Sequence, residues 1–97
     1  MVSKILIIED EAAIRRVLTK IISEENENYI VEDAEDGLVG IDMISKSDYD
    51  LVLCDIKMPK MDGVEVLERI KVLKPEIPVV MISGHGDLDT AVNTMRL

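Results

Sequence analysis

The chain has 97 residues and a formal net charge of −9, with 47% hydrophobic and 32% charged residues. This length allows one small domain, whose core must be aliphatic because Trp and Phe are absent. The acidity argues against direct nucleic-acid binding by this segment, which would need Lys and Arg for phosphate contacts. A single cysteine, Cys54, excludes an intrachain disulfide. The apolar stretches are too short for a signal peptide or a membrane span, so we expect a cytoplasmic protein.

The first strand and helix are predicted near the N-terminus. Residues 4–8 form an apolar, β-branched run that is typical of a buried strand, and the acidic pair Glu9 and Asp10 follows it. A helix is expected to start at Asp10 or Glu11, where acids suit the cap and the helix dipole, and to end near Glu25. Its apolar face at helical spacing consists of Ile14, Val17, Leu18, Ile21 and Ile22.

The second strand and helix are more weakly marked. Residues 29–31 predict a short strand, which the acids Glu32 and Asp33 follow. A helix is expected over residues 37–47, although two glycines lower its helix propensity. The residues expected to face inward are Leu38, Ile41 and Ile44.

The third strand and helix surround the most informative segment of the chain. Residues 51–54 are purely apolar, which predicts a strand buried on both faces, and the run ends at the carboxylate of Asp55. A third helix is predicted over residues 64–74, with Asp62 as its cap and Pro75 as its stop. Leu67, Ile70 and Leu73 recur at helical spacing and are expected to face inward.

The last predicted pair is a strand over residues 79–82 and a helix that starts at Asp87. The strand ends at Ser83, and apolar residues recur at helical spacing from Leu88 to Met95. The alternation of strands and helices, without an internal repeat, predicts an α/β fold with a doubly wound parallel sheet. We expect a single domain over residues 1–97.

Three of the predicted strands end in polar side chains: Glu9 and Asp10, then Asp55, then Ser83. In open α/β sheets, ligands bind at the carboxyl ends of the strands. If the first and third strands are neighbours, the three carboxylates converge and repel one another, so they require a cation or a proton. Oxygen ligands suit Mg²⁺, and an aspartate beside Mg²⁺ can act as a nucleophile in phosphoryl transfer. The simpler interpretation is that these acids only cap helices or begin a turn.

At these residues the chain closely resembles the receiver domains of bacterial two-component response regulators. The resemblance rests on Glu9-Asp10, on the pattern D-x-x-M-P-x-M-D-G from Asp55 to Gly63, and on P-V-V-M-I-S from Pro78 to Ser83. It implies a flavodoxin-like fold with sheet order 2-1-3-4-5. It also implies a non-enzymatic signalling module that a sensor histidine kinase phosphorylates. The S-G-H-G-D run at residues 83–87 resembles receivers of enhancer-binding activators, which implies transcription regulation through downstream domains.

The resemblance assigns roles to five residues of this chain. Asp55 would be the phosphoacceptor, and Ser83 would be the hydroxyl residue that moves toward the phosphoryl group. Asp10 would be the principal Mg²⁺ ligand, together with Asp55 and the backbone carbonyl of Lys57. Glu9 would act mainly through a metal-bound water.

The chain departs from the family pattern at its C-terminal end, where it has no counterpart of the fifth strand and fifth helix. We therefore expect a receiver domain truncated after the fourth helix. The lysine that receivers carry on the fifth strand is also absent, so we expect very slow or absent phosphorylation and no proper switching. Truncation would leave residues 79–82 as an apolar sheet edge, which favours a homodimer through the fourth strand or fourth helix.

Two other functions stay open at this point. A Mg²⁺-dependent phosphohydrolase also uses an aspartyl nucleophile, but such enzymes usually carry a second acid two residues later, where this chain has Lys57. A non-catalytic fragment that acts by oligomerising is the other alternative. Incubation with a small phosphodonor and Mg²⁺ separates the three functions, because they give a lasting phosphoprotein, steady turnover and neither product, respectively.

Overall fold

Strands and helices alternate along residues 2–82, which are the residues that the computed structural model describes. The elements are β1 (Ser3–Ile8), α1 (Ala12–Glu25), β2 (Tyr29–Ala34), α2 (Gly37–Lys46), β3 (Leu51–Asp55), α3 (Gly63–Leu73) and β4 (Val79–Ile82). The predicted site residue Ser83 and the helix expected from Asp87 lie outside the described residues. No helix of residues 2–82 combines the length and apolarity that a membrane crossing requires.

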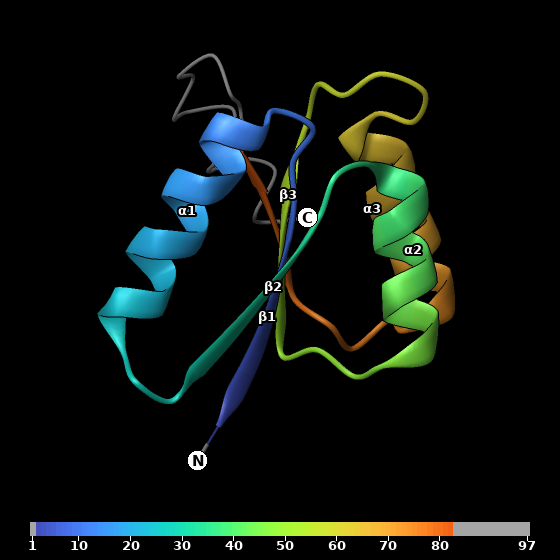
Figure 1. The fold of residues 1–97 in the computed structure, drawn as a ribbon. Helices are drawn as coiled ribbons and strands as arrows, with labels where there is room; N and C mark the ends of the chain where they lie inside the picture. The colour runs from blue at the N-terminus through green and yellow to red at the C-terminus, as the bar shows by residue number, and fades with distance from the viewer. Residues whose placement is uncertain (1, 83–97) are drawn as a thin grey trace.

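The strands of residues 2–82 form one parallel sheet in the order β2-β1-β3-β4. This order confirms the predicted doubly wound α/β architecture, with β1 and β3 as neighbours. At the carboxyl end of the sheet, Ile8 pairs with Ala34 on one side and with Cys54 on the other. Asp55, the last residue of β3, pairs with Ile82 of β4. The loops after β1 and β3 therefore leave the sheet at the same edge (Figure 1).

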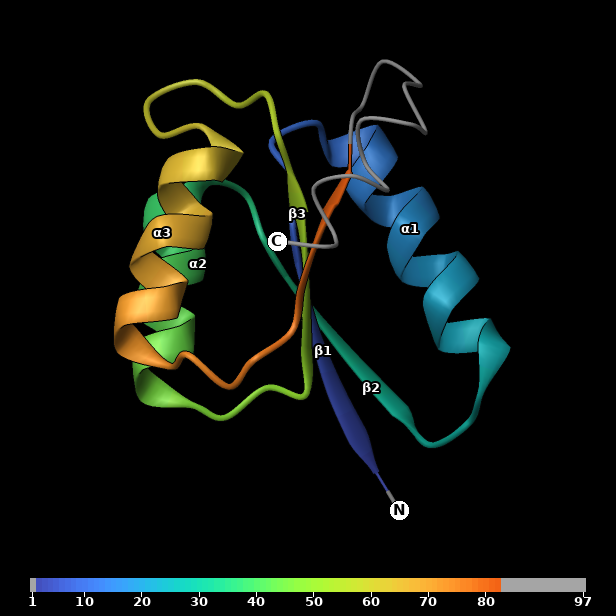
Figure 2. The same cartoon turned by 180° about the vertical axis from the view of Figure 1, so that it is seen from behind.

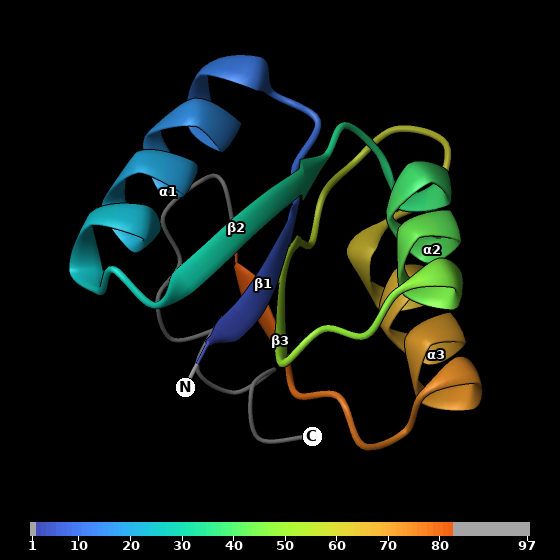
Figure 3. The same ribbon diagram turned by 60° about the horizontal axis from the view of Figure 1, so that its bottom comes forward.

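Helices lie on both faces of the sheet, so the described chain has three layers. Helix α1 covers one face, and α2 and α3 lie side by side on the other (Figures 1 and 2). The view from below separates the layers, with the sheet running between α1 and the α2–α3 pair (Figure 3). Two parallel strands can be joined only by a connection that returns along a face of the sheet. The helices occupy these connections and therefore cover the faces.

The core lies mainly between the sheet and the α2–α3 pair. Alternate residues of β1 and β3 point toward these helices and are buried, as are Ile44 of α2 and Val66 and Ile70 of α3. Helix α2 comes close to β1 at Gly40, where an added Cβ would overlap the side chain of Ile8. Close-packed aliphatic residues thus form this side of the domain, as the composition predicts.

The α1 face is packed less tightly than the α2–α3 face. The predicted apolar positions Ile14, Leu18 and Ile22 are half-buried, whereas Val17 and Ile21 are 56% and 57% exposed. No residue within α1 is fully buried. The predicted apolar face of this helix therefore contacts the sheet along one flank only.

Several predicted details are wrong. Strand β2 continues through Glu32 and Asp33 to Ala34, because its pairing with β1 extends to Ile8. Leu38, expected to face inward, is 54% exposed because α2 turns Gly37, Gly40 and Ile44 toward the core.

Helices α1 and α3 also differ from expectation in their details. In α3 the buried positions are Val66 and Ile70, and Leu73 at the last position is 47% exposed. Asp62 caps this helix as predicted, because its side chain accepts a hydrogen bond from the N–H of Glu65. Glu11 precedes α1 but makes no side-chain capping hydrogen bond.

Candidate functional site

Three carboxylates meet at the carboxyl edge of the sheet. Glu9 and Asp10 follow β1, and Asp55 ends β3. One oxygen from each side chain lies within 4.8 Å of the others. The convergence that the sequence predicts is confirmed, and its cause is the direct pairing of β1 with β3.

Glu9 is almost completely buried, with 1% of its surface exposed. Its Oε1 accepts a hydrogen bond from the backbone N–H of Glu11 at 3.1 Å. Its Oε2 is buried and has no hydrogen-bond partner among the described residues. Burial raises the pKa of Glu9 to about 7; the Glu11 N–H opposes this shift and the charge of Asp55 adds to it. A buried, unsatisfied carboxylate oxygen costs free energy unless a proton or a cation accompanies it.

Asp55 is also buried, at 4% exposure, and the loop after it folds back against its backbone. The N–H of Lys57 donates to Oδ1 of Asp55 in a long contact of 3.4 Å. Gly63 donates from its N–H to the carbonyl of Ile56 at 2.8 Å. A Cβ at Gly63 would overlap the carbonyl oxygen of Asp55, so this close approach requires glycine.

Of the two remaining predicted site residues, the structure describes only Lys57. The Lys57 side chain is exposed, and its backbone lies beside the Asp55 carboxylate. Ser83 is outside the described residues. Cys54 is buried as predicted, and burial, followed by the charges of Asp55 and Glu9, raises the pKa of its thiol to about 12. The thiol therefore stays protonated and takes no part as a nucleophile.

Arg15 of α1 is the residue that the sequence interpretation missed. Its Nη1 donates to the backbone carbonyl of Glu9 at 2.8 Å, and its Nε donates to Oδ2 of Asp33 at 2.7 Å. The sequence pattern places Arg15 only away from the apolar face of the helix. Its partner Asp33 becomes apparent only once β2 is known to extend beside β1, so no local signal identifies the contact.

A hollow of about 370 Å³ opens beside the acidic cluster. Both acids and bases line it, and Lys60, in the loop after β3, has a backbone φ of 69° that is uncommon for a residue other than glycine. The hollow gives an approach to Asp10 from solvent. Its lining residues are Asp10, Ala12, Arg15, Glu35, Asp36, Pro59 and Lys60.

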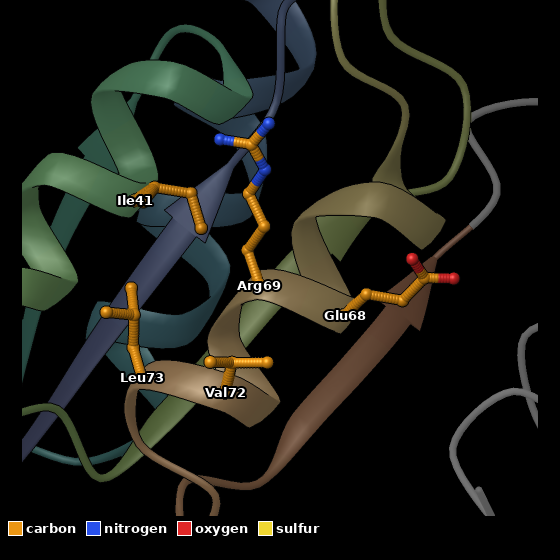
Figure 4. Close-up of a pocket in the computed structure, with 5 residues that line it drawn as sticks. All are labelled: Ile41, Glu68, Arg69, Val72 and Leu73. Carbon is orange, nitrogen blue, oxygen red and sulfur yellow. The ribbon is translucent and has the colours of Figure 1, made fainter.

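A second hollow, of about 510 Å³, lies on the outer surface of the two paired helices. Ile41 of α2 and Glu68, Arg69, Val72 and Leu73 of α3 line it (Figure 4). None of these residues belongs to the acidic cluster. Its larger volume therefore does not make it the better site, because the groups that can carry out chemistry are at the sheet edge.

Known proteins resemble the chain over almost its whole length. Residues 5–97 match the family described as the response regulator receiver domain. The sporulation initiation phosphotransferase F of Bacillus subtilis is 40% identical over 97 residues, which are 100% of this chain and 77% of that protein. A crystal structure of a response regulator receiver domain protein from Clostridium thermocellum shares 32% identity at a TM-score of 0.83, covering 98% of this chain and 75% of that one.

The chain belongs to the response regulator receiver domain family. Its relatives include larger proteins such as the transcriptional regulatory protein ZraR of Klebsiella oxytoca, 35% identical over 92 residues. These residues are 95% of this chain and 20% of ZraR, so the chain matches only one part of that regulator. Within the described residues, the acidic cluster of this receiver domain consists of Glu9, Asp10 and Asp55.

Proposed function

We propose that this receiver domain accepts a phosphoryl group on Asp55 from a sensor histidine kinase, with Mg²⁺ bound at the acidic cluster. The observation that carries the proposal is the convergence of three carboxylates, one of which keeps a buried oxygen without a hydrogen-bond partner in the described chain. Such a group of like charges requires a counter-charge or a proton, and a bound cation supplies the counter-charge. Membership of the receiver family supports the same chemistry.

The residues at the sheet edge fit Mg²⁺. Every side-chain donor in the cluster is an oxygen, which is the ligand type that Mg²⁺ prefers, and one or two carboxylates suffice because the ion retains several waters. In our proposal Asp10 and Asp55 would be direct ligands, the backbone carbonyl of Lys57 would be a third, and Glu9 would act mainly through a metal-bound water. When bound, Mg²⁺ neutralises the charge on the phosphoryl oxygens during transfer.

The transfer itself needs one nucleophile and one leaving group. A carboxylate oxygen of Asp55 forms a bond to the phosphorus of a phosphohistidine, while the bond between phosphorus and the imidazole nitrogen breaks. The electron pair of that bond stays with the nitrogen, which takes up a proton as the imidazole leaves. Burial of Asp55 limits access by water, and Ser83 would donate a hydrogen bond to a phosphoryl oxygen of the product.

Membership of the receiver family supports the proposed kinase partner and the proposed output. The module acts as a phosphoacceptor and not as an enzyme with turnover, and it regulates transcription through further domains, as in relatives whose names identify them as transcriptional regulators.

Among the described strands, β4 lies at the edge of the sheet, and its burial pattern alternates between buried and half-buried residues. We propose that a second copy can pair along this edge. Light scattering over a range of concentrations tests this, and a monomer at every concentration would contradict it.

The phosphorylation proposal is tested with a small phosphodonor such as acetyl phosphate, in the presence and absence of Mg²⁺. Intact-mass spectrometry should show one added phosphoryl group in the unchanged chain with Mg²⁺ and none in Asp55→Asn. Asp62→Asn is the matched control, because it changes an aspartate of the same loop to a residue that also caps helices. Labelling of Asp55→Asn would overturn the assignment. Steady release of phosphate without a lasting phosphoprotein would indicate a phosphohydrolase instead.

A further inference from the structure

Arg15 connects the acidic cluster to the neighbouring strand β2. Its two donor groups point in different directions: Nη1 contacts the Glu9 carbonyl at 2.8 Å and Nε contacts Asp33 at 2.7 Å. The side chain is 18% exposed, so the ion pair with Asp33 is partly shielded from water. We call these two contacts the Arg15 bridge. A planar guanidinium with several fixed donors suits such a bridge better than a lysine amine does.

The bridge lies at the β1–α1 connection, where hydrogen bonds also hold Glu9. The N–H of Glu9 donates to the carbonyl of Ala34 at 3.2 Å, which ties the same residue to the end of β2. Helix α1 has no fully buried residue, so apolar packing alone holds the start of this helix weakly. The acidic pair that begins this connection therefore depends on polar contacts for its position.

We propose that Arg15 is a positioning residue, which holds Glu9 and Asp10 in the arrangement that binds the divalent cation. The inference rests on the proposed function, because it assumes that the acidic cluster is the Mg²⁺ site. Arg15 itself contacts the backbone of Glu9 and not its carboxylate, so it acts on the geometry of the cluster and does not occupy a ligand position. Partners of metal ligands that orient them typically change metal affinity by about 10–100-fold when removed.

A positioning role of Arg15 and a simple effect of its charge predict opposite changes in Mg²⁺ affinity when Arg15 is replaced. If Arg15 influenced the site only through its positive charge, replacing it with a neutral residue would remove repulsion and tighten Mg²⁺ binding. If the bridge positions the ligands, the same replacement weakens binding although a positive charge is lost. Arg15→Lys keeps the positive charge but cannot present two donors in the same fixed geometry. This variant therefore distinguishes the effect of the charge from the effect of the bridge.

The experiment is a Mg²⁺ titration of the ¹⁵N-labelled chain, followed through the amide shifts of Asp10 and Asp55. We expect the dissociation constant to rise about tenfold in Arg15→Gln and by a smaller factor in Arg15→Lys. Arg16→Gln is the matched control, since Arg16 is the adjacent arginine, is exposed, and makes no hydrogen bond or ion pair with another residue of the range 2–82. Its dissociation constant should stay within about twofold of the unchanged chain.

Two further measurements distinguish a positioning role of Arg15 from a general loss of folding. In the metal-free chain, the amide of Glu11, which donates to Glu9 Oε1, should exchange its hydrogen faster in Arg15→Gln while core amides of α3 keep their protection. Asp33→Asn should weaken binding, and the double variant with Arg15→Gln should be no weaker than Arg15→Gln alone, because both changes break the same bridge.

The outcomes are distinct. Unchanged or tighter binding in Arg15→Gln, with the unchanged chain binding Mg²⁺, would overturn the positioning role and leave the proposed function intact. An unchanged chain that fails to bind Mg²⁺ at all would overturn the proposed function and the positioning role with it. Additive effects of Arg15→Gln and Asp33→Asn would show that the two residues act separately, which also contradicts the bridge.

Discussion

The two faces of the sheet are covered by helices with similar apolar periodicity but very different burial. On one face, Ile44 of α2 and Val66 and Ile70 of α3 are completely buried. On the other face, α1 buries no residue completely, and its apolar positions Val17 and Ile21 stay more than half exposed. Periodicity therefore identifies which side of a helix can be buried, but not how deeply the helix packs.

Small residues at the contact explain much of this difference. In α2, Gly37 and Gly40 face the core, and an added Cβ at either position would overlap an apolar side chain from another element. In α3, Gly63 lies against the backbone of Asp55. Helix α1 contains no glycine, and branched side chains occupy its contact positions. Close approach of backbone to sheet thus accompanies full burial, and it is seen only on the α2–α3 face of the described chain.

The first prediction compares the same substitution, isoleucine to alanine, on the two faces of the sheet. Ile70→Ala, at a fully buried site, should lower the free energy of unfolding by about 2–5 kcal/mol. Ile21→Ala, at a site that is 57% exposed, should lower it by less than about 1 kcal/mol. Urea unfolding followed by circular dichroism measures both. Equal losses would mean that α1 is packed as firmly as α3.

The second prediction concerns Glu9, which directly follows β1 at the carboxyl end of the sheet. Its native pKa of about 7 exceeds the ordinary value of 4.5, so between these pH values the native state binds more protons than the unfolded state. Stability of the metal-free chain should therefore fall as pH rises from about 4.5 to 7, by at most about 3 kcal/mol. Denaturant unfolding at several pH values should show this slope, and Glu9→Gln should flatten it.

A control variant and added Mg²⁺ test whether Glu9 causes the pH dependence of stability. Glu11→Gln, which changes the exposed neighbour of the acidic pair, should leave the slope in place. Saturating Mg²⁺ should reduce it, because a cation favours the charged carboxylate. A Glu9→Gln variant that keeps the full slope would show that another group titrates instead.

The third prediction tests the close approach at Gly63. Gly63→Ala should destabilise the chain by about 1–3 kcal/mol, because the new methyl group meets backbone that cannot move without shifting Asp55. Gly40→Ala should cost less, since the group it meets is the side chain of Ile8 and not backbone. Urea unfolding of the two variants gives the comparison. A larger loss for Gly40→Ala would contradict the argument.

The smallest expected effect comes from ion pairs on the outer surface of the well-packed face. Lys46 and Asp42 form an (i, i+4) pair on α2 at 3.1 Å, and their side chains are 72% and 60% exposed. Lys46→Gln should change the free energy of unfolding by less than about 0.5 kcal/mol. A loss comparable to that of Ile70→Ala would mean that this face depends on surface charge and not on apolar burial.

Much of the fold and part of the candidate site could be predicted from the sequence. Apolar runs locate β1, β3 and β4, and parallel order brings Glu9, Asp10 and Asp55 together. The extent of β2 could not be predicted, because Glu32 and Asp33 join the strand only through pairing with β1. The contact between Arg15 and Asp33 depends on that same pairing and was missed for this reason. Depth of burial in α1 depends on tertiary contacts, which periodicity does not contain.

The central claim is that the acidic cluster, and not the larger apolar hollow, is the functional site. Titration of Mg²⁺ into the ¹⁵N-labelled chain tests it most directly. We predict saturable shifts of the Asp10, Asp55 and Lys57 amides, with a dissociation constant of the order of millimolar because few carboxylates bind the ion. The amides of Ile41 and Val72 at the hollow should not shift, and Asp55→Asn should weaken the response. Absence of saturable shifts at Asp10 and Asp55, or equal binding by Asp55→Asn, would contradict the claim.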